Sequence, residues 1–306
     1  MAALGKAFTL TVNESPDHFL GMNLELGDSS MVKLSNEAFI KKLAEEYLDK
    51  PAESYHHQLP ADRSLADAYA GALRAKLNGE HADPKLVKRY MSTVGALMYV
   101  VPSCRPEVAH CVGILARALT FPTPEMLTCA QRVIAWLARH PTHGMKYDGN
   151  VTDAHVLVAY SDSDWGIKPS TTGWYVQLAG AGVSWRSARQ HSVATSTTEA
   201  EIIAASDAAL EVTYLRGLLA EMGFRQTSPT VLYVDNSGAV ELSRDLKSCQ
   251  RSRHIERRYL KVRELVAAGE IEVRAIDTKN NPADLFTKST LDVSTFTRHA
   301  ASVKGN

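Results

Sequence analysis

Nearly continuous apolar runs alternate with longer amphipathic segments in the second half of the chain. The run at 155–160 predicts a strand buried on both faces. Two shorter apolar segments that follow it in the sequence predict the other two strands of a three-stranded meander. Residues 230–234 and 270–276 predict two further strands. The segments between and after them predict helices at 197–210, 211–222, 237–246, 254–268 and 281–288. This order predicts an α/β (α+β) fold, a mixed five-stranded sheet with flanking helices.

The first half of the chain predicts short strands followed by helices. Residues 8–12 alternate, and residues 19–34 contain two alternating segments around the turn cluster Gly27-Asp-Ser-Ser, which indicates a hairpin. Periodicity is lost at 50–66, which we interpret as a linker. Pro102 is expected to break the helical pattern that precedes it. Apolar stripes predict helices at 35–47, 84–101, 105–120 and 122–140.

The charge balance excludes a strongly basic protein. The 306 residues include 34 Lys and Arg against 34 Asp and Glu, and neutrality holds in both halves of the chain. A polyanionic partner would therefore depend on a local concentration of basic side chains rather than on net charge. With 45% hydrophobic residues, the chain is long enough for two ordinary domains with cores of their own.

Cysteine usage and hydropathy indicate an intracellular protein. The four cysteines form no Cys-x-x-Cys pair and no zinc-finger spacing with histidine, which argues against a disulfide framework and against structural zinc. The longest apolar runs fall short of the roughly 20 residues that span a bilayer. The N-terminus lacks the pattern of a signal peptide. We expect a cytoplasmic or nuclear location, no secretion and no contact with membranes.

Four acidic side chains lie where a sheet of this kind presents its ligands. Asp162 and Asp235 each end an apolar strand. Glu201 lies one turn inside a predicted helix, and Asp284 lies in the first turn of the last one. A buried carboxylate is costly unless it is paired or binds metal. Four hard oxygen donors without cysteine or histidine favour two Mg²⁺ or Mn²⁺ ions, which predicts metal-assisted hydrolysis of a phosphodiester.

Each acid also has a structural explanation when it is taken alone. Asp235 could cap the following helix, and Glu199 and Glu201 could be surface charges in the first turn of another. Asp162 and Asp164 form an Asp-x-Asp after a buried strand, a pattern that is also found in haloacid-dehalogenase phosphatases. The residues that follow and the order of the later elements fit those phosphatases poorly.

Several sequence blocks carry a family resemblance. Five of them, in order along the chain, are Tyr160-Ser-Asp-Ser-Asp-Trp-Gly, 184–201, Tyr233-Val-Asp-Asn-Ser-Gly-Ala, 251–264 and Ala283-Asp-Leu-Phe-Thr-Lys. Together they resemble the ribonuclease H domain of copia-type LTR retrotransposon polyproteins. Upstream, residues 18–23 resemble the end of the reverse-transcriptase palm, and residues 90–107 resemble its thumb and connection region. The resemblance covers most of residues 8–290.

The resemblance implies an organisation for the whole chain. It divides the chain into the palm end, thumb remnant and linker at 1–66, a helical connection region at 67–150, a ribonuclease H domain at 151–290 and a tail at 291–306. The family's polymerase site, a Tyr-x-Asp-Asp, is missing because the sequence has no adjacent aspartates. We therefore expect no polymerase activity. We also expect the chain to be a C-terminal piece of a longer polyprotein, whose polymerase part would be a partner.

The resemblance also implies an activity. Carried over to matching positions, the family's catalytic and metal-binding acids fall on Asp162, Glu201, Asp235 and Asp284. Glu201 matches better than Glu199 because Ile-Ile-Ala follows it. The implied reaction is endonucleolytic cleavage of the RNA strand in an RNA–DNA hybrid, with two Mg²⁺ or Mn²⁺ ions and no small-molecule cofactor. The alternative is a non-catalytic, hybrid-binding or interaction fragment of a decayed element, against which the intact carboxylates argue.

Basic side chains concentrate on one predicted helix. Residues 247–263 contain seven Lys and Arg and one acid, so the polar face of this helix could follow a phosphate backbone. A solvated helix face is the ordinary alternative. A second candidate patch contains an indole that could pack on a sugar or could belong to the sheet core. The candidate nucleic-acid-binding residues are Arg253, His254, Arg257, Arg258 and Lys261 on the helix, and Trp185, Arg186, Arg189 and Gln190 in the second patch.

Overall fold

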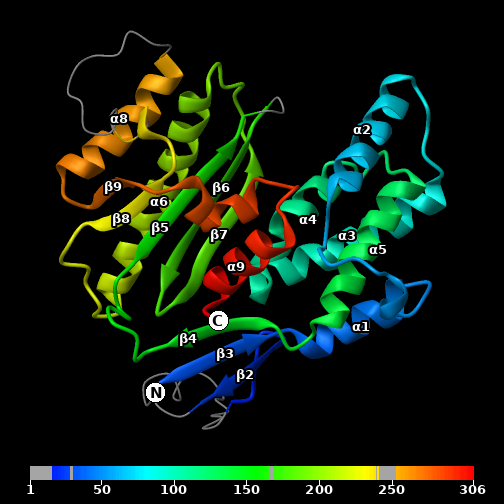
Figure 1. The fold of residues 1–306 in the computed structure, drawn as a ribbon, viewed down its shortest axis with the longest axis horizontal. Coiled ribbons are helices and arrows are strands. Elements are labelled where there is room, and N and C mark those ends of the chain that lie inside the picture. The colour runs from blue at the N-terminus through cyan, green and yellow to red at the C-terminus, as the bar shows by residue number, and fades with distance from the viewer. Residues whose placement is uncertain (1–15, 28–29, 166–168, 239, 241–252) are drawn as a thin grey trace, which may run out of the picture.

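Two β-sheets and a set of helices make up the computed structural model, which describes residues 16–27, 30–165, 169–238, 240 and 253–306, with the backbone alone for 253–257 and 259. One sheet has four strands in the order β1-β2-β3-β4, and the other has five in the order β7-β6-β5-β8-β9. Figure 1 shows the helices α1 to α5 to the right of the five-stranded sheet, with the four-stranded sheet below that sheet. The strand predicted at 8–12 and most of the helix predicted at 237–246 lie outside the described residues.

The larger sheet confirms the predicted fold class. Its strands are β5 (Val158–Asp164), β6 (Thr171–Leu178), β7 (Ala181–Arg189), β8 (Thr230–Val234) and β9 (Ile271–Ala275). β5, β6 and β7 form the predicted antiparallel meander, while β8 runs parallel to β5 and β9 runs parallel to β8. Because β5 and β8 are parallel neighbours, their carboxyl ends lie together at one edge of the sheet.

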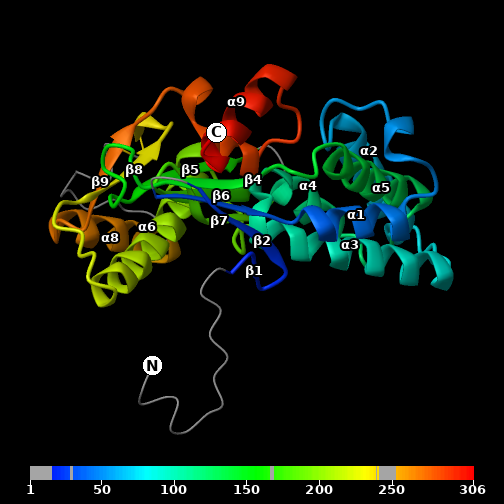
Figure 2. The same cartoon turned by 90° about the horizontal axis from the view of Figure 1, so that it is seen from below.

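Two helices cover one face of this sheet. They are α6 (Thr197–Glu221) and α8 (Arg253–Ala267), which lie side by side below the strands in Figure 2. Their buried side chains join those of β5, β8 and β9 in one apolar cluster. The prediction of two helices over 197–222 was wrong, because no Gly or Pro interrupts the chain at 210–211. α6 continues instead to Glu221, and Gly223 follows with a left-handed φ of 90°.

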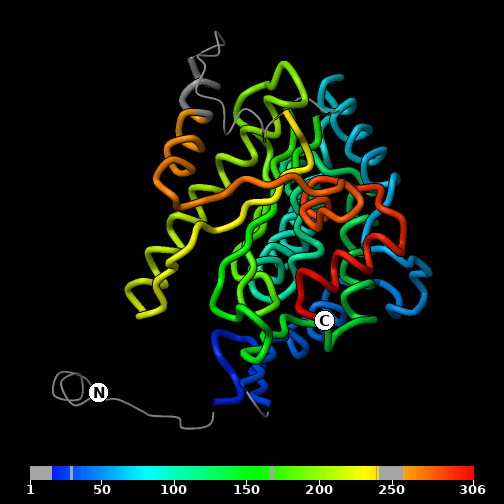
Figure 3. The backbone as a smooth tube through the Cα atoms, turned by 60° about the vertical axis from the view of Figure 1, so that its left-hand side comes forward, coloured from blue at the N-terminus to red at the C-terminus, as the bar shows by residue number. Residues whose placement is uncertain are grey.

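The opposite face is covered by the last segment of the chain. After the 3₁₀ turns η4 (Thr278–Asn280) and η5 (Pro282–Phe286), the helix α9 (Val293–Lys304) ends the chain. Figure 3 shows this segment crossing the sheet from β9 towards the helical region. The helix predicted at 281–288 is therefore a 3₁₀ turn, and the segment at 291–306 contains a helix that begins at its capping residue Asp292.

The close passage of η5 over β6 depends on one glycine. A Cβ at Gly173 would lie 2.8 Å from the Cβ of Phe286, so the turn could not approach the strand with any larger residue there. Gly173 is also the cross-strand partner of Asp162. The sequence of β6 therefore brings η5 and the residues after it next to Asp162.

The helical region packs against the sheet through a shared core. Its elements are α1 (Glu37–Tyr47), η2 (Ala52–Ser54), α2 (Arg63–Leu77), α3 (Pro84–Cys104), η3 (Pro106–Val108), α4 (Ala109–Ala116) and α5 (Pro124–Arg139). The core formed by these helices continues into Tyr175, Phe286 and Phe296. The linker predicted at 50–66 is too long, because α2 already begins after its capping residue Asp62. The break predicted at Pro102 is wrong, because this residue lies within the last turn of α3.

The smaller sheet confirms the N-terminal hairpin, formed by its two central strands, and adds one strand on each side of it. It consists of β1 (His18–Phe19), β2 (Met22–Leu26), β3 (Met31–Ser35) and β4 (Gly144–Asp148). β4 pairs antiparallel with β3 and was not predicted. This pairing joins the two ends of the helical region. None of the described helices is both long and apolar enough to cross a membrane.

Candidate active site

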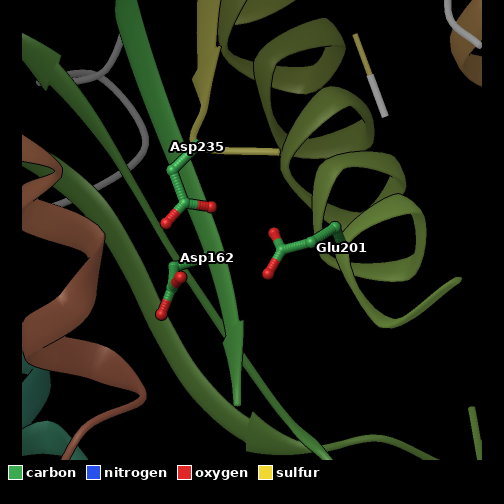
Figure 4. Close-up of side chains that lie close together, drawn as sticks. All are labelled: Asp162, Glu201 and Asp235. Carbon is green, nitrogen blue, oxygen red and sulfur yellow. The ribbon is translucent and has the colours of Figure 1, made fainter. Parts of the chain in front are cut away.

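Three carboxylates converge where β5 and β8 end. Asp162 lies on β5, Asp235 directly follows β8, and Glu201 lies in the first turns of α6. One oxygen from each of the three lies within 4.8 Å of the others, and Figure 4 shows the side chains pointing towards one another. The parallel pairing of the two strands and the N-terminus of α6 thus bring together acids that are up to 73 residues apart in the sequence.

The Asp162 carboxylate is buried beside other acids. Its side chain accepts a hydrogen bond from the Thr287 hydroxyl, and the residue is only 2% exposed. Burial raises its pKa to about 7, with Asp284 and Asp235 adding to the rise and Lys288 opposing it. A carboxylate with so few partners favours either a proton or a cation.

Glu201 has one satisfied and one unsatisfied oxygen. Its Oε1 accepts hydrogen bonds from the Ser163 backbone N–H at 3.1 Å and from the Ser163 hydroxyl at 2.7 Å. Its Oε2 is buried and has no partner within the described residues. Burial, followed by the charge of Asp162, raises the Glu201 pKa well above its ordinary value. An orphaned carboxylate oxygen that faces two more acids fits a hard divalent cation such as Mg²⁺ or Mn²⁺.

Glu199 has a different environment although it lies two residues away. Its Oε2 accepts hydrogen bonds from the Thr195 backbone N–H at 2.8 Å and from the Thr195 hydroxyl at 2.6 Å. The Ser196 hydroxyl in turn accepts from the Glu199 N–H, which caps α6. Glu199 therefore holds the start of the helix, whereas Glu201 faces the other acids.

Asp284 lies near the three acids but has a basic partner. It is on η5, is 4% exposed, and its Oδ1 accepts a hydrogen bond from Lys288 Nζ at 2.6 Å. Burial raises its pKa, and its charge in turn raises that of Asp162. Thr287 and Lys288 were not predicted as site residues. Both belong to the block 283–288, three and four residues after Asp284, and the tight turn that the structure shows there brings them to the side of Asp284.

Two of the predicted substrate-binding residues have structural contacts. The Trp185 indole N–H donates to the Val101 carbonyl at 3.2 Å and packs against the helical region. Gln190 is buried, and its amide donates to Thr172 Oγ1 at 3.1 Å and to the Ala200 carbonyl at 3.0 Å. These contacts favour the core alternative for Trp185 and place Gln190 between the sheet and α6.

The remaining predicted binding residues are basic and differ in their surroundings. Arg186 and Arg189 are exposed on β7. On α8, Arg258 pairs with Asp207 of α6 at 3.1 Å, and Lys261 pairs with Glu264 at 3.8 Å. The side chains of Arg253, His254 and Arg257 lie outside the described part of the structure, so their role stays a prediction.

A histidine of the helical region supports the segment that carries the site. Its two ring nitrogens lie 3.3 Å from the Ser187 hydroxyl and 2.8 Å from the Ser289 hydroxyl. This residue, His110, is buried, and burial lowers its pKa to about 4. In its neutral form, His110 therefore links α4 to β7 and to Ser289, the residue that follows Lys288.

The buried acids predict how stability depends on pH. Between the ordinary Asp value of 3.8 and the Asp162 pKa of about 7, the folded protein holds a proton that the unfolded chain has lost. The free energy of unfolding of metal-free protein should therefore fall as the pH rises through this window. If these acids hold Mg²⁺, it should raise the melting temperature more at about pH 8 than at about pH 5.5, because a divalent ion would bind the deprotonated acids. Melting curves with Mg²⁺ and with EDTA at both pH values measure this, and an equal effect of Mg²⁺ would contradict it.

Comparisons with known proteins find several retrovirus-related Pol polyproteins among the relatives. The chain is 30% identical over 290 residues to the retrovirus-related Pol polyprotein from transposon TNT 1-94 of Nicotiana tabacum, covering 93% of this chain and 21% of that polyprotein. It is 36% identical over 204 residues to the retrovirus-related Pol polyprotein from transposon RE1 of Arabidopsis thaliana, covering 65% of this chain and 14% of that polyprotein. No family model matches. A solved ribonuclease H1 isolated from compost aligns with 44% of this chain and 93% of its own, at 15% identity and a TM-score of 0.35.

Proposed function

Because the chain belongs to the family of copia-type retrovirus-related Pol polyproteins, we propose that it is a ribonuclease H that cleaves the RNA strand of RNA–DNA hybrids with two divalent metal ions. The chain spans about a fifth or less of these relatives, 21% of one and 14% of two others. The observation that carries the proposal is the cluster of Asp162, Glu201 and Asp235, in which one buried Glu201 oxygen has no partner among the residues that the structure describes.

In this proposal each acid has a defined task. Asp162 is close to Glu201 and Asp235 and also interacts with Asp284, so it would be shared between the two ions. Bound Mg²⁺ or Mn²⁺ would activate a water molecule and stabilise the leaving oxygen of the phosphodiester. Ser163 and Thr287 orient the carboxylates of Glu201 and Asp162 through hydrogen bonds, which fixes the ligands before the substrate binds.

The substrate would approach along basic side chains. Arg186 and Arg189 on β7 and the basic residues of α8 are the candidates for contacts with the phosphates of the hybrid. The acids of α6 and α8 that pair with Arg258 and Lys261 reduce the charge available there. We therefore expect binding to depend on salt with a modest slope rather than a steep one.

We also propose the domain organisation that the resemblance implies. Residues 151–290 would carry the nuclease, and residues 1–66 and 67–150 would correspond to the end of the polymerase and its connection region. The polymerase part of the family's polyprotein would be a partner. The shared core of Tyr175, Phe286 and Phe296 with the helices indicates that the nuclease depends on the connection region for stability.

A cleavage assay tests the proposed function. Labelled RNA is offered in an RNA–DNA hybrid, in an RNA duplex and as a single strand, with Mg²⁺, Mn²⁺ or EDTA. We expect cleavage of the hybrid alone, and only with a divalent ion. Salt-dependent binding of the hybrid without cleavage under either ion would contradict a nuclease and would support a hybrid-binding fragment.

A further inference from the structure

One lysine is fixed among the acids of the site. Lys288 Nζ lies 2.6 Å from Asp284 Oδ1, and its charge also acts on Asp162 and Asp235. The lysine side chain is 33% exposed, whereas that of Asp284 is 6% exposed, so the buried carboxylate is paired with a lysine that reaches it from a partly exposed position. An ammonium group in this place offsets the negative charge that burial makes costly.

The backbone around this lysine is held in place. The Lys288 N–H donates to the Asp284 carbonyl at 2.9 Å, which closes the turn that brings the two side chains together. The next residue, Ser289, is tied to His110 at 2.8 Å, and the preceding one, Thr287, bonds to Asp162. The position of the ammonium group is therefore set by the fold and not by a freely moving surface side chain.

The acids of the site thus form two groups that differ in charge. Asp162, Glu201 and Asp235 are mutually close, and Glu201 leaves one oxygen without a partner in the described structure. Asp284 already has a cationic partner. No basic side chain of the described residues is paired with the first group, so a divalent ion can enter it without displacing one of them, whereas an ion at Asp284 competes with an ammonium group for the same oxygens.

We propose that Lys288 is a built-in cation that makes metal binding sequential: the first ion binds to Asp162, Glu201 and Asp235, and the second has to displace Lys288 from Asp284. This inference rests on the proposed two-metal site. It assigns Lys288 a positioning role, which keeps Asp284 paired until the second ion arrives. The second ion therefore binds more weakly than the first.

Removal of the lysine charge should strengthen metal binding. A unit charge about 6 Å from a divalent ion in water contributes about 1.4 kcal/mol, so Lys288→Gln should tighten binding of the second Mn²⁺ by about tenfold or more. Lys288→Arg keeps the charge and should keep the difference between the two steps. Lys279 is an exposed lysine on η4 and serves as the control. Lys279→Gln removes the same charge at a position away from Asp284, so it should leave both binding steps unchanged.

Calorimetric titration of the full chain with Mn²⁺ alone measures both steps. Two unequal steps in wild type and a tighter second step in Lys288→Gln support the proposal. Equal steps in wild type, or a second step that Lys288→Gln leaves unchanged, overturn it. Since Lys288→Gln protein could fail to fold, NMR of the Lys288 Cε in wild type gives a second test. Its signal should move with the second ion, and a signal that moves with the first ion or not at all overturns the proposal.

The titration does not depend on the nuclease assay. Absence of hybrid cleavage in wild type would remove the proposed function, but the order of metal binding would still be measured. Conversely, normal cleavage together with an unchanged titration in Lys288→Gln would overturn only the role of the lysine. The two failures are therefore distinguishable.

Discussion

Glu201→Gln protein should cleave RNA–DNA hybrids at least about a hundredfold more slowly than wild type, whereas Glu199→Gln protein should cleave at a near wild-type rate. The two residues lie in the same helix turn and have the same side chain. Only Glu201 faces Asp162 and Asp235, and only its Oε2 lacks a partner among the described residues. A neutral amide there would remove a proposed metal ligand, but the same change at Glu199 weakens a helix cap.

The comparison controls for the loss of charge and for the helix itself. Glu199→Gln should lower the free energy of unfolding by about 1 kcal/mol, as the loss of a capping contact does. Rates at saturating Mg²⁺ and melting curves for both variants separate the two effects. Equal loss of cleavage in both variants would assign the defect to α6 as a whole and would contradict a specific role for Glu201.

The second large effect concerns stability, at a buried ion cluster between η3 and α9. Glu107 accepts from Arg105 Nε at 2.8 Å, with both side chains fully buried, and Lys304 Nζ lies 3.7 Å away. Glu107→Gln leaves two buried cations without their carboxylate, so we expect a loss of about 3–5 kcal/mol in the free energy of unfolding. Lys304 is the last residue of α9, and the loss should therefore also loosen the C-terminal helix.

Urea unfolding of the variant measures this loss. Glu125→Gln, an exposed acid in the first turn of α5, is the matched control and should cost less than about 1 kcal/mol. A Glu107→Gln variant as stable as the control would show that the buried charges contribute nothing specific. An unstable variant that retains metal-dependent cleavage when folded would confirm that this cluster acts on stability and not on chemistry.

The acids could be found in the sequence because their placement follows local rules. A buried strand that ends in aspartate appears twice, at Asp162 and Asp235, and the parallel pairing of β5 and β8 brings the two ends together. Glu201 was separable from Glu199 by the residues that follow it. The role of Lys288 was not predictable, because it depends on the tight turn after Asp284 and on the closeness of that turn to β6, which Gly173 permits.

The elements that were missed depend on distant parts of the chain. β4 pairs with β3 from more than 100 residues away, and its own five residues have little strand character. α2 is rich in alanine, so it lacks a strong apolar stripe, although Leu65 and Ala72 are buried. Trp185 and Gln190 have side chains suited to binding nucleic acid. The contact of Trp185 with α3 and the burial of Gln190 against α6 follow from packing that no local pattern reveals.

The most direct test of the account is cleavage of a labelled RNA–DNA hybrid by wild type, Asp162→Asn and Asp153→Asn proteins in Mg²⁺. Asp153 is an exposed turn residue with a left-handed backbone that asparagine also adopts, so its variant controls for the substitution. We predict cleavage by wild type and Asp153→Asn and none by Asp162→Asn. Cleavage that persists in Asp162→Asn would contradict the assignment of the acid cluster as the active site.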